Sequence, residues 1–201
     1  IPDKPWLLFR RPRPNRRDSL SPLNRYIGTS LVSKHHLFAW ISIDVLPSNL
    51  VIVIARDDEY FFGLLQSRIH EVWARRAGTQ LREAESGYRY TPTSTFETFP
   101  FPWPPGKEPS EDEDPRVRAI AEAARELVEQ RQRWLNPGTL SASKLKKRTL
   151  TNLYNQNPTW LQLSHEQLDR AVLDAYGWPH DLKDEEILER LLALNLRRAE
   201  T

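Results

Sequence analysis

The chain has 201 residues, of which 39% are apolar and 28% are charged, and its formal net charge is +2. This length is sufficient for one large or two small domains with their own cores. The sequence has no apolar run of about 20 residues, so we expect no membrane-spanning helix and no membrane partner. It also has no cysteine, which excludes disulfides and thiolate metal sites and agrees with a cytoplasmic location.

Positive charge is concentrated near the start of the chain. The first 25 residues contain seven basic and two acidic side chains, and the densest run is Arg10, Arg11, Arg13, Arg16 and Arg17. Such an arm is typical of a solvated tail, and binding to phosphate backbones is the alternative. Because the chain begins with Ile rather than Met, we expect it to be a piece of a longer polypeptide.

Three segments between residues 25 and 55 have the composition of β-strands. They are "RYIGTSLV", "HLFAWISIDV" and "LVIVIA", and "LPSNL" supplies a turn before the last of them. The run "VIVI" is apolar on both faces, which favours a central place in the sheet. Asp57 or Asp58 then caps one predicted helix over residues 59–77, which Gly78 ends.

The segment from Thr93 to Pro115 separates two kinds of sequence. Its closely spaced prolines exclude a helix and a central strand. Its aromatic rings are unusual for a disordered linker, so we expect it to pack in extended form against a domain surface. The sequence therefore predicts an α+β protein: a mixed α/β domain with a small sheet and packed helices over residues 1–105, followed by a small all-helical domain over residues 106–201.

Helical spacing dominates the second half. Asp114 caps a predicted helix, and a second helix is expected over about 143–154. Ser164 begins a capping box for a third helix that ends at Gly177, and Asp184 caps a fourth. We expect three tryptophans in the core of this domain: Trp134, Trp160 and Trp178.

No pattern in the sequence predicts a catalytic or metal site. The five histidines lack the spacing of metal ligands, and His70 on an amphipathic helix is interpreted as structural. The stretch "QNPTW" resembles the Asn-Pro-Pro-aromatic motif of adenine methyltransferases, but its third motif position is Thr159 and it follows a predicted helix. A turn between helices is the better interpretation.

The stretch "TQLREAESGYRY", residues 79–90, offers polar side chains that suit DNA bases. Arg pairs with guanine O6 and N7, Gln with adenine, and Glu accepts a hydrogen bond from cytosine N4. The candidates here are Gln80, Arg82, Glu83 and Arg89, close to the rings of Tyr88 and Tyr90. Any exposed hairpin carries similar residues, so this chemistry alone leaves both interpretations open.

Three blocks of the sequence resemble a known family when they are taken in order. "NRYIGTSLVSKHHLFAW", "FFGLLQSRIHEVWARRAGTQL" and "YRYTPTSTFETFPFPWP" resemble the target-recognition region of MmeI-like, adenine-specific DNA methyltransferases, in which methylation and restriction share one polypeptide. The tail from "TLTNLYNQNPTW" onward is similar to the C-terminal domain of that family. One departure is "GTQLREAESGYRYT", which is longer than the "GRLKSDYRYS"-like stretch of many relatives.

The resemblance implies a division of labour within a longer enzyme. An N-terminal methyltransferase domain of the same polypeptide would bind S-adenosylmethionine and transfer the methyl group to adenine N6. The present chain would hold no cofactor and no catalytic residue, and would select the site on double-stranded DNA. We expect base reading by Gln80, Arg82, Glu83 and Arg89, with a second patch at Ser33, Lys34 and His35, and phosphate contacts from the arginine run at residues 10–17.

A protein-interaction module is the alternative function. In that case the proline-aromatic segment would be a docking ligand and the helical domain a scaffold. A salt titration with duplex DNA separates the two functions, because phosphate contacts make affinity fall steeply with salt.

Overall fold

Two small antiparallel sheets and a set of helices make up the part of the chain that the computed structural model describes, residues 20–35, 37–80, 87–138 and 141–200. This arrangement confirms the predicted α+β class. The strands are β1 (Arg25–Ser30), β2 (Val32–Ser33), β3 (Phe38–Ser42), β4 (Val51–Ile54), β5 (Thr79–Gln80) and β6 (Tyr88–Arg89). The helices are α2 (Glu59–Gln66), α3 (Arg68–Ala77), the π-helical turn η2 (Pro92–Phe96), α4 (Pro115–Leu135), α5 (Ala142–Leu145), α6 (Leu150–Gln156), α7 (Thr159–Tyr176) and α8 (Asp184–Ala199).

The first sheet has the strand order β3-β1-β4, so the central strand is β1. Tyr26 and Ile27 of β1 are fully buried, whereas three of the four residues of β4 are only partly buried. The prediction that "VIVI" lies centrally is therefore wrong, since β4 is at the edge of this sheet and, among the described strands, pairs only with β1. Apolar residues on both faces of a strand favour burial, but they do not determine how many other strands it pairs with.

The predicted helix over 59–77 is two helices that meet at Ser67. Ser67 has an extended backbone (φ −72°, ψ 156°), and its hydroxyl donates to the Leu64 carbonyl at 2.7 Å. The same hydroxyl oxygen accepts from the His70 amide at 3.4 Å, so it caps α3. A serine side chain that bonds to nearby backbone groups competes with the continuous helix. The predicted ends are confirmed, because Asp58 caps α2 and Gly78 is the C-cap of α3.

The helical region confirms α4 with its Asp114 cap, and corrects other boundaries. The helix expected over about 143–154 is divided into α5 and α6. Helix α7 begins at Thr159, before the expected cap, and Ser164 lies inside it with its hydroxyl donating to the Trp160 carbonyl at 2.9 Å. The N-cap of α8 is Lys183, one residue before the predicted Asp184.

The tryptophans of this region are less buried than expected. Trp134, Trp160 and Trp178 pack against the edge of the core and are only partly buried. The places between the helices are occupied by smaller apolar side chains, including Ile120, Leu127 and Leu168, which are fully buried. Tryptophan has a large apolar ring with a polar N–H, so it often lies at the boundary between core and solvent. A prediction from hydrophobicity alone therefore places these side chains too deep in the core.

The proline-aromatic segment packs between the two halves of the chain. Phe99 stacks on His70 with ring centroids 4.6 Å apart, and Phe101 stacks on Phe61 at 5.0 Å. From the helical region, the Tyr176 hydroxyl donates to the Pro100 carbonyl at 2.9 Å. The prediction that this segment packs against a surface is confirmed, although Pro92–Phe96 forms a π-helical turn rather than extended chain.

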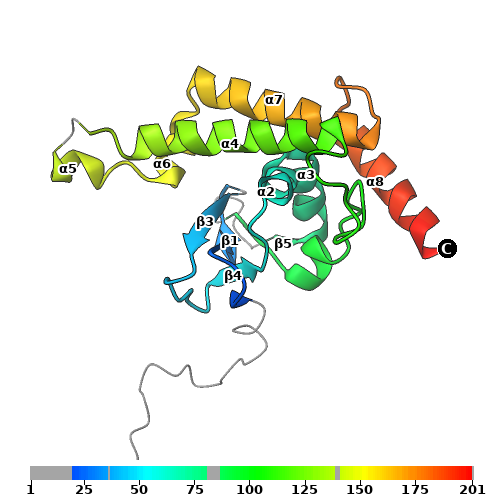
Figure 1. Cartoon of the computed structure of the whole chain (residues 1–201), viewed down its shortest axis with the longest axis horizontal. Helices are drawn as coiled ribbons and strands as arrows, with labels where there is room; N and C mark the ends of the chain where they lie inside the picture. The colour runs from blue at the N-terminus through cyan, green and yellow to red at the C-terminus, as the bar shows by residue number, and fades with distance from the viewer. Residues whose placement is uncertain (1–19, 36, 81–86, 139–140, 201) are drawn as a thin grey trace, which may run out of the picture.

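One buried core extends across the predicted domain boundary. Helix α4 lies against both α2 and α7, and in Figure 1 α4 and α7 run side by side above α2 and α3. The apolar cluster includes residues from β1 through α8. The division into units 1–105 and 106–201 therefore remains a prediction, and the two parts share their packing.

Candidate nucleic-acid interface

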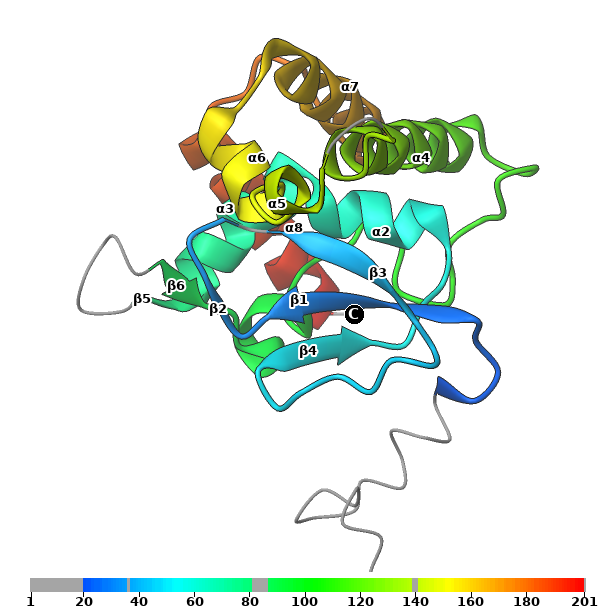
Figure 2. The same cartoon turned by 90° about the vertical axis from the view of Figure 1, so that its left-hand side faces the viewer.

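The second sheet brings together candidate residues that are far apart in the sequence. Its strand order is β2-β6-β5, and β6 is central. Ser33 pairs with Tyr88, and Arg89 faces both Val32 and Thr79. Gln80 pairs with Tyr88 through its backbone. Ser33 from one predicted patch and Arg89 from the other thus lie in one small sheet at the edge of the molecule (Figure 2).

Two buried tyrosines, Tyr88 and Tyr90, pack this sheet against α3. Tyr88 is 7% exposed and Tyr90 is 2% exposed, so neither ring is available to a base. The Tyr90 hydroxyl is 3.1 Å from Nε2 of His70, and the Arg75 guanidinium lies over the Tyr88 ring at 5.2 Å. Burial raises the pKa of both phenols well above the usual value. The interpretation of His70 as a structural residue agrees with its complete burial in this cluster.

Gly87 sets how closely β6 approaches β2. Its φ is +82°, and a Cβ atom at this position would lie 2.1 Å from the Ser33 carbonyl oxygen. L-residues with a side chain rarely adopt this backbone conformation. The pairing of Ser33 with Tyr88 therefore depends on glycine at this position.

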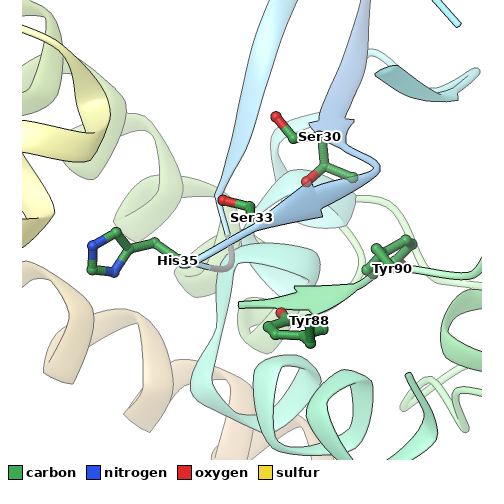
Figure 3. A pocket seen from close by; sticks show the side chains of 6 residues that line it. Ser30, Ser33, His35, Tyr88 and Tyr90 are labelled. Carbon is green, nitrogen blue, oxygen red and sulfur yellow. The ribbon is translucent and has the colours of Figure 1, made fainter. Parts of the chain in front are cut away.

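A small hollow lies beside the sheet, lined by Thr29, Ser30, Ser33, His35, Tyr88 and Tyr90. Figure 3 shows the serines and tyrosines around it, while the His35 ring points away toward the helices. Among the described residues, the lining offers hydroxyl groups, which donate and accept hydrogen bonds, and contains no carboxylate or lysine. This set of groups suits polar recognition, and Nε2 of the His35 ring lies 2.9 Å from Asn155 Oδ1 of α6.

Lys34 and His35 reach across to α6. Lys34 Nζ donates to Asn155 Oδ1 at 3.2 Å, and His35 Nε2 lies 2.9 Å from the same oxygen. Since a carbonyl oxygen only accepts, Nε2 of His35 carries the proton in this contact. The His35 ring also lies 5.8 Å from the Tyr154 ring. The candidate residues Lys34 and His35 are therefore bound to the helical region.

A buried arginine fixes Tyr154 from the other side. Arg131 is 3% exposed, and its guanidinium donates to Gln66 Oε1 at 2.9 Å and to the Tyr154 hydroxyl. The Tyr154 hydroxyl is in turn 2.7 Å from His165 Nε2. Burial and the nearby Arg131 charge lower the pKa of His165 to about 3, so this imidazole is neutral and accepts the bond.

Sequence reasoning missed the roles of Asn155 and Arg131. Arg131 falls in the apolar stripe of its helix, and a charged residue at such a position is itself a signal of a buried polar partner. Asn155 carries no local signal, because its partners lie about 120 positions earlier in the chain.

The remaining candidates differ in how far the structure places them. Arg89 is exposed on the central strand. Gln80 is placed by its backbone pairing alone. The other candidates lie outside the described residues: Arg10, Arg11, Arg13, Arg16, Arg17, Arg82 and Glu83.

Metal sites and membrane spans are both absent from the described residues. These residues contain no group of three or more His, Cys, Asp or Glu side chains placed to hold a metal ion. None of the described helices is long and apolar enough to cross a membrane.

Comparison with known proteins identifies the part of the chain that contains this sheet. Residues 29–103 match the family model of the MmeI target recognition domain. These residues form an MmeI-like target recognition domain. The matched range of this domain includes every base-reading candidate and excludes the arginine run at residues 10–17.

Two longer proteins resemble the MmeI-like domain together with the helical region. DNA methyltransferase A of Bacillus subtilis (strain 168) is 31% identical over 184 residues, which are 89% of this chain and 18% of that protein. The solved structure of the Type IIL restriction-modification enzyme MmeI in complex with DNA superposes with a TM-score of 0.70 at 26% identity. That match covers 89% of this chain and 22% of the MmeI chain, so this chain spans about a fifth of either relative.

Proposed function

We propose that this chain is the sequence-recognition part of a site-specific DNA methyltransferase of the restriction-modification type. The observation that carries the proposal is the sheet β2-β6-β5, whose backbone pairing places Ser33, Gln80 and Arg89 on adjacent strands within the MmeI-like domain. Polar side chains on a rigid support are what direct base reading requires. The relatives are a DNA methyltransferase and an enzyme solved in complex with DNA, which supports double-stranded DNA as the partner.

The base-reading surface is centred on β6 and the segment before it. The antiparallel pair β5-β6 fixes the chain on both sides of residues 81–86, and these residues include the candidates Arg82 and Glu83. We assign base contacts to these two residues together with Gln80 and Arg89. Ser33, Lys34 and His35 form the adjoining patch, and the arginine run at residues 10–17 contacts phosphates.

The complete enzyme carries out the chemistry elsewhere. Its methyltransferase domain, on the same polypeptide, holds S-adenosylmethionine and methylates adenine at N6, and the enzyme acts on DNA in the cytoplasm. The alternative function as a protein-interaction module is less well supported. Phe99 and Phe101 of the proline-aromatic segment are 4% exposed, so these rings are not available to a second protein.

The test is methylation of a randomised DNA library by the complete enzyme carrying Arg82→Ala, Glu83→Ala or Arg89→Ala. Removing a side chain that bonds a base costs about 1–3 kcal/mol and relaxes the requirement at one position of the site. Lys107→Ala is the control, because it removes an exposed charge outside the matched domain. If all three variants modify the parental motif with equal stringency at every position, this strand and its preceding segment do not read bases.

A further inference from the structure

The helical region has a basic stretch in an otherwise acidic context. Residues 130–165 contain six Lys or Arg and no Asp or Glu. The other residues of the region 106–201 contain nine Lys or Arg against 17 Asp or Glu. Since like charges repel, such segregation favours a surface that meets a polyanion over a uniformly solvated one.

The basic stretch includes α5 and α6, which lie beside the candidate patch formed by Ser33, Lys34 and His35. Figure 2 shows α5 and α6 on the same side of the molecule as β2 and β3. The contact is direct, because Asn155 of α6 accepts from Lys34 at 3.2 Å and bonds His35 at 2.9 Å. In Figure 1 this end of the molecule is opposite α8.

Three lysines of this stretch face solvent, and their segment is held in place. Lys144, Lys146 and Lys147 are exposed, and none of them pairs with a carboxylate among the described residues. Arg148 anchors the segment, since its guanidinium donates to the Trp134 carbonyl and lies 4.4 Å from the Trp134 ring centroid. Asn152 adds a bond to the Lys147 carbonyl at 2.7 Å.

We infer that Lys144, Lys146 and Lys147 form a second DNA-contacting surface, which binds phosphates flanking the bases read by the β2-β6-β5 sheet. This inference rests on the proposed function and extends it to the helical region. A lysine ammonium contacts phosphate as a point charge and carries no base information. The surface therefore contributes affinity and register, and the sequence preference stays with the sheet.

The experiment measures binding of the 201-residue chain to a short fluorescent duplex of random sequence between about 50 and about 200 mM salt. The triple variant Lys144→Gln, Lys146→Gln, Lys147→Gln should flatten the slope of log K against log salt by about 0.9 for each phosphate that is no longer neutralised. The matched control removes three exposed charges from the α8 end: Lys183→Gln, Arg190→Gln and Arg197→Gln. We expect the control to keep the wild-type slope.

The outcomes separate this inference from the proposed function. If the wild type binds with a steep slope and the triple lysine variant keeps that slope, the α5-α6 surface does not contact phosphates and only this inference fails. Equal flattening in the lysine and control variants reports net charge alone and also overturns it. If the wild type binds no duplex at any salt concentration, the proposed function fails and the inference fails with it.

Discussion

Replacing Gly87 by Ala tests whether the β2-β6-β5 sheet depends on the close approach of β6 to β2. The new Cβ would lie 2.1 Å from the Ser33 carbonyl oxygen and 2.8 Å from the Lys34 amide nitrogen. A left-handed backbone costs a residue with a side chain about 1–2 kcal/mol. Overpacking against fixed atoms adds about 1–3 kcal/mol, so we expect a total loss of about 3 kcal/mol in the free energy of unfolding. Separation of the short β2-β6 pair limits this loss, because a two-residue pairing can open locally.

Gly106 provides the matched control for this substitution. Its φ is +83°, and an added Cβ would meet nothing within 4 Å, so Gly106→Ala isolates the backbone strain. Urea denaturation of both variants should show a larger loss for Gly87→Ala. In the complete enzyme, Gly87→Ala should also relax the methylated motif, whereas Gly106→Ala should preserve it. Equal destabilisation by the two substitutions would refute the role of the close approach.

Three further predictions concern polar groups on α4, α6 and α7: Arg131, Asn155, and Asp169, which accepts from the Arg68 amide at 2.7 Å. Arg131→Ala should lower the free energy of unfolding, measured by urea denaturation, by about 2–5 kcal/mol. Arg131→Met should lower it less, because methionine keeps the packing of the aliphatic part of the arginine side chain, and equal losses would contradict this. Burial raises the pKa of Asp169 to about 7, so this group makes wild-type stability fall as pH rises from about 4 to about 7. The stability of Asp169→Asn relative to wild type should therefore increase over this range and level off above it, and parallel pH curves would contradict this. Asn155→Ala should lower the free energy of unfolding by about 1 kcal/mol and relax the base requirement at one position of the methylated motif. An unchanged motif would show that base recognition does not depend on the hydrogen bonds from Asn155 to Lys34 and His35.

The elements that sequence analysis predicted correctly are those with strong local signals. Helix α4 has a cap, a proline at its first position and a long apolar stripe, and these signals predict it over its whole length. The break at Ser67 was missed because the apolar spacing of α2 continues into α3. The place of β4 at the sheet edge was missed because strand order depends on pairing between distant residues, which composition does not report.

The candidate site was predictable in its parts and not in its assembly. Gln80 and Arg89 are close in sequence, so the pairing of their strands β5 and β6 could be anticipated. That Ser33 joins them depends on a pairing between residues more than 50 positions apart. The contribution of α6 depends on one hydrogen-bonding side chain, Asn155, in a segment whose local pattern predicts only a helix and a turn.

The contact at Asn155 has a consequence for transferring specificity between members of this family. Exchanging residues 29–103 with a relative would move Lys34 and His35 but leave Asn155 behind, since it lies outside the matched domain. The new side chains at 34 and 35 would then meet a partner selected for the old ones. The contact is exposed to solvent, so losing one of its hydrogen bonds costs about 0.5–1.5 kcal/mol, which overlaps the lower end of the cost of one base contact. We therefore expect such an exchange to transfer the positions read by β6 and to weaken the position next to α6, unless residue 155 is exchanged with the domain.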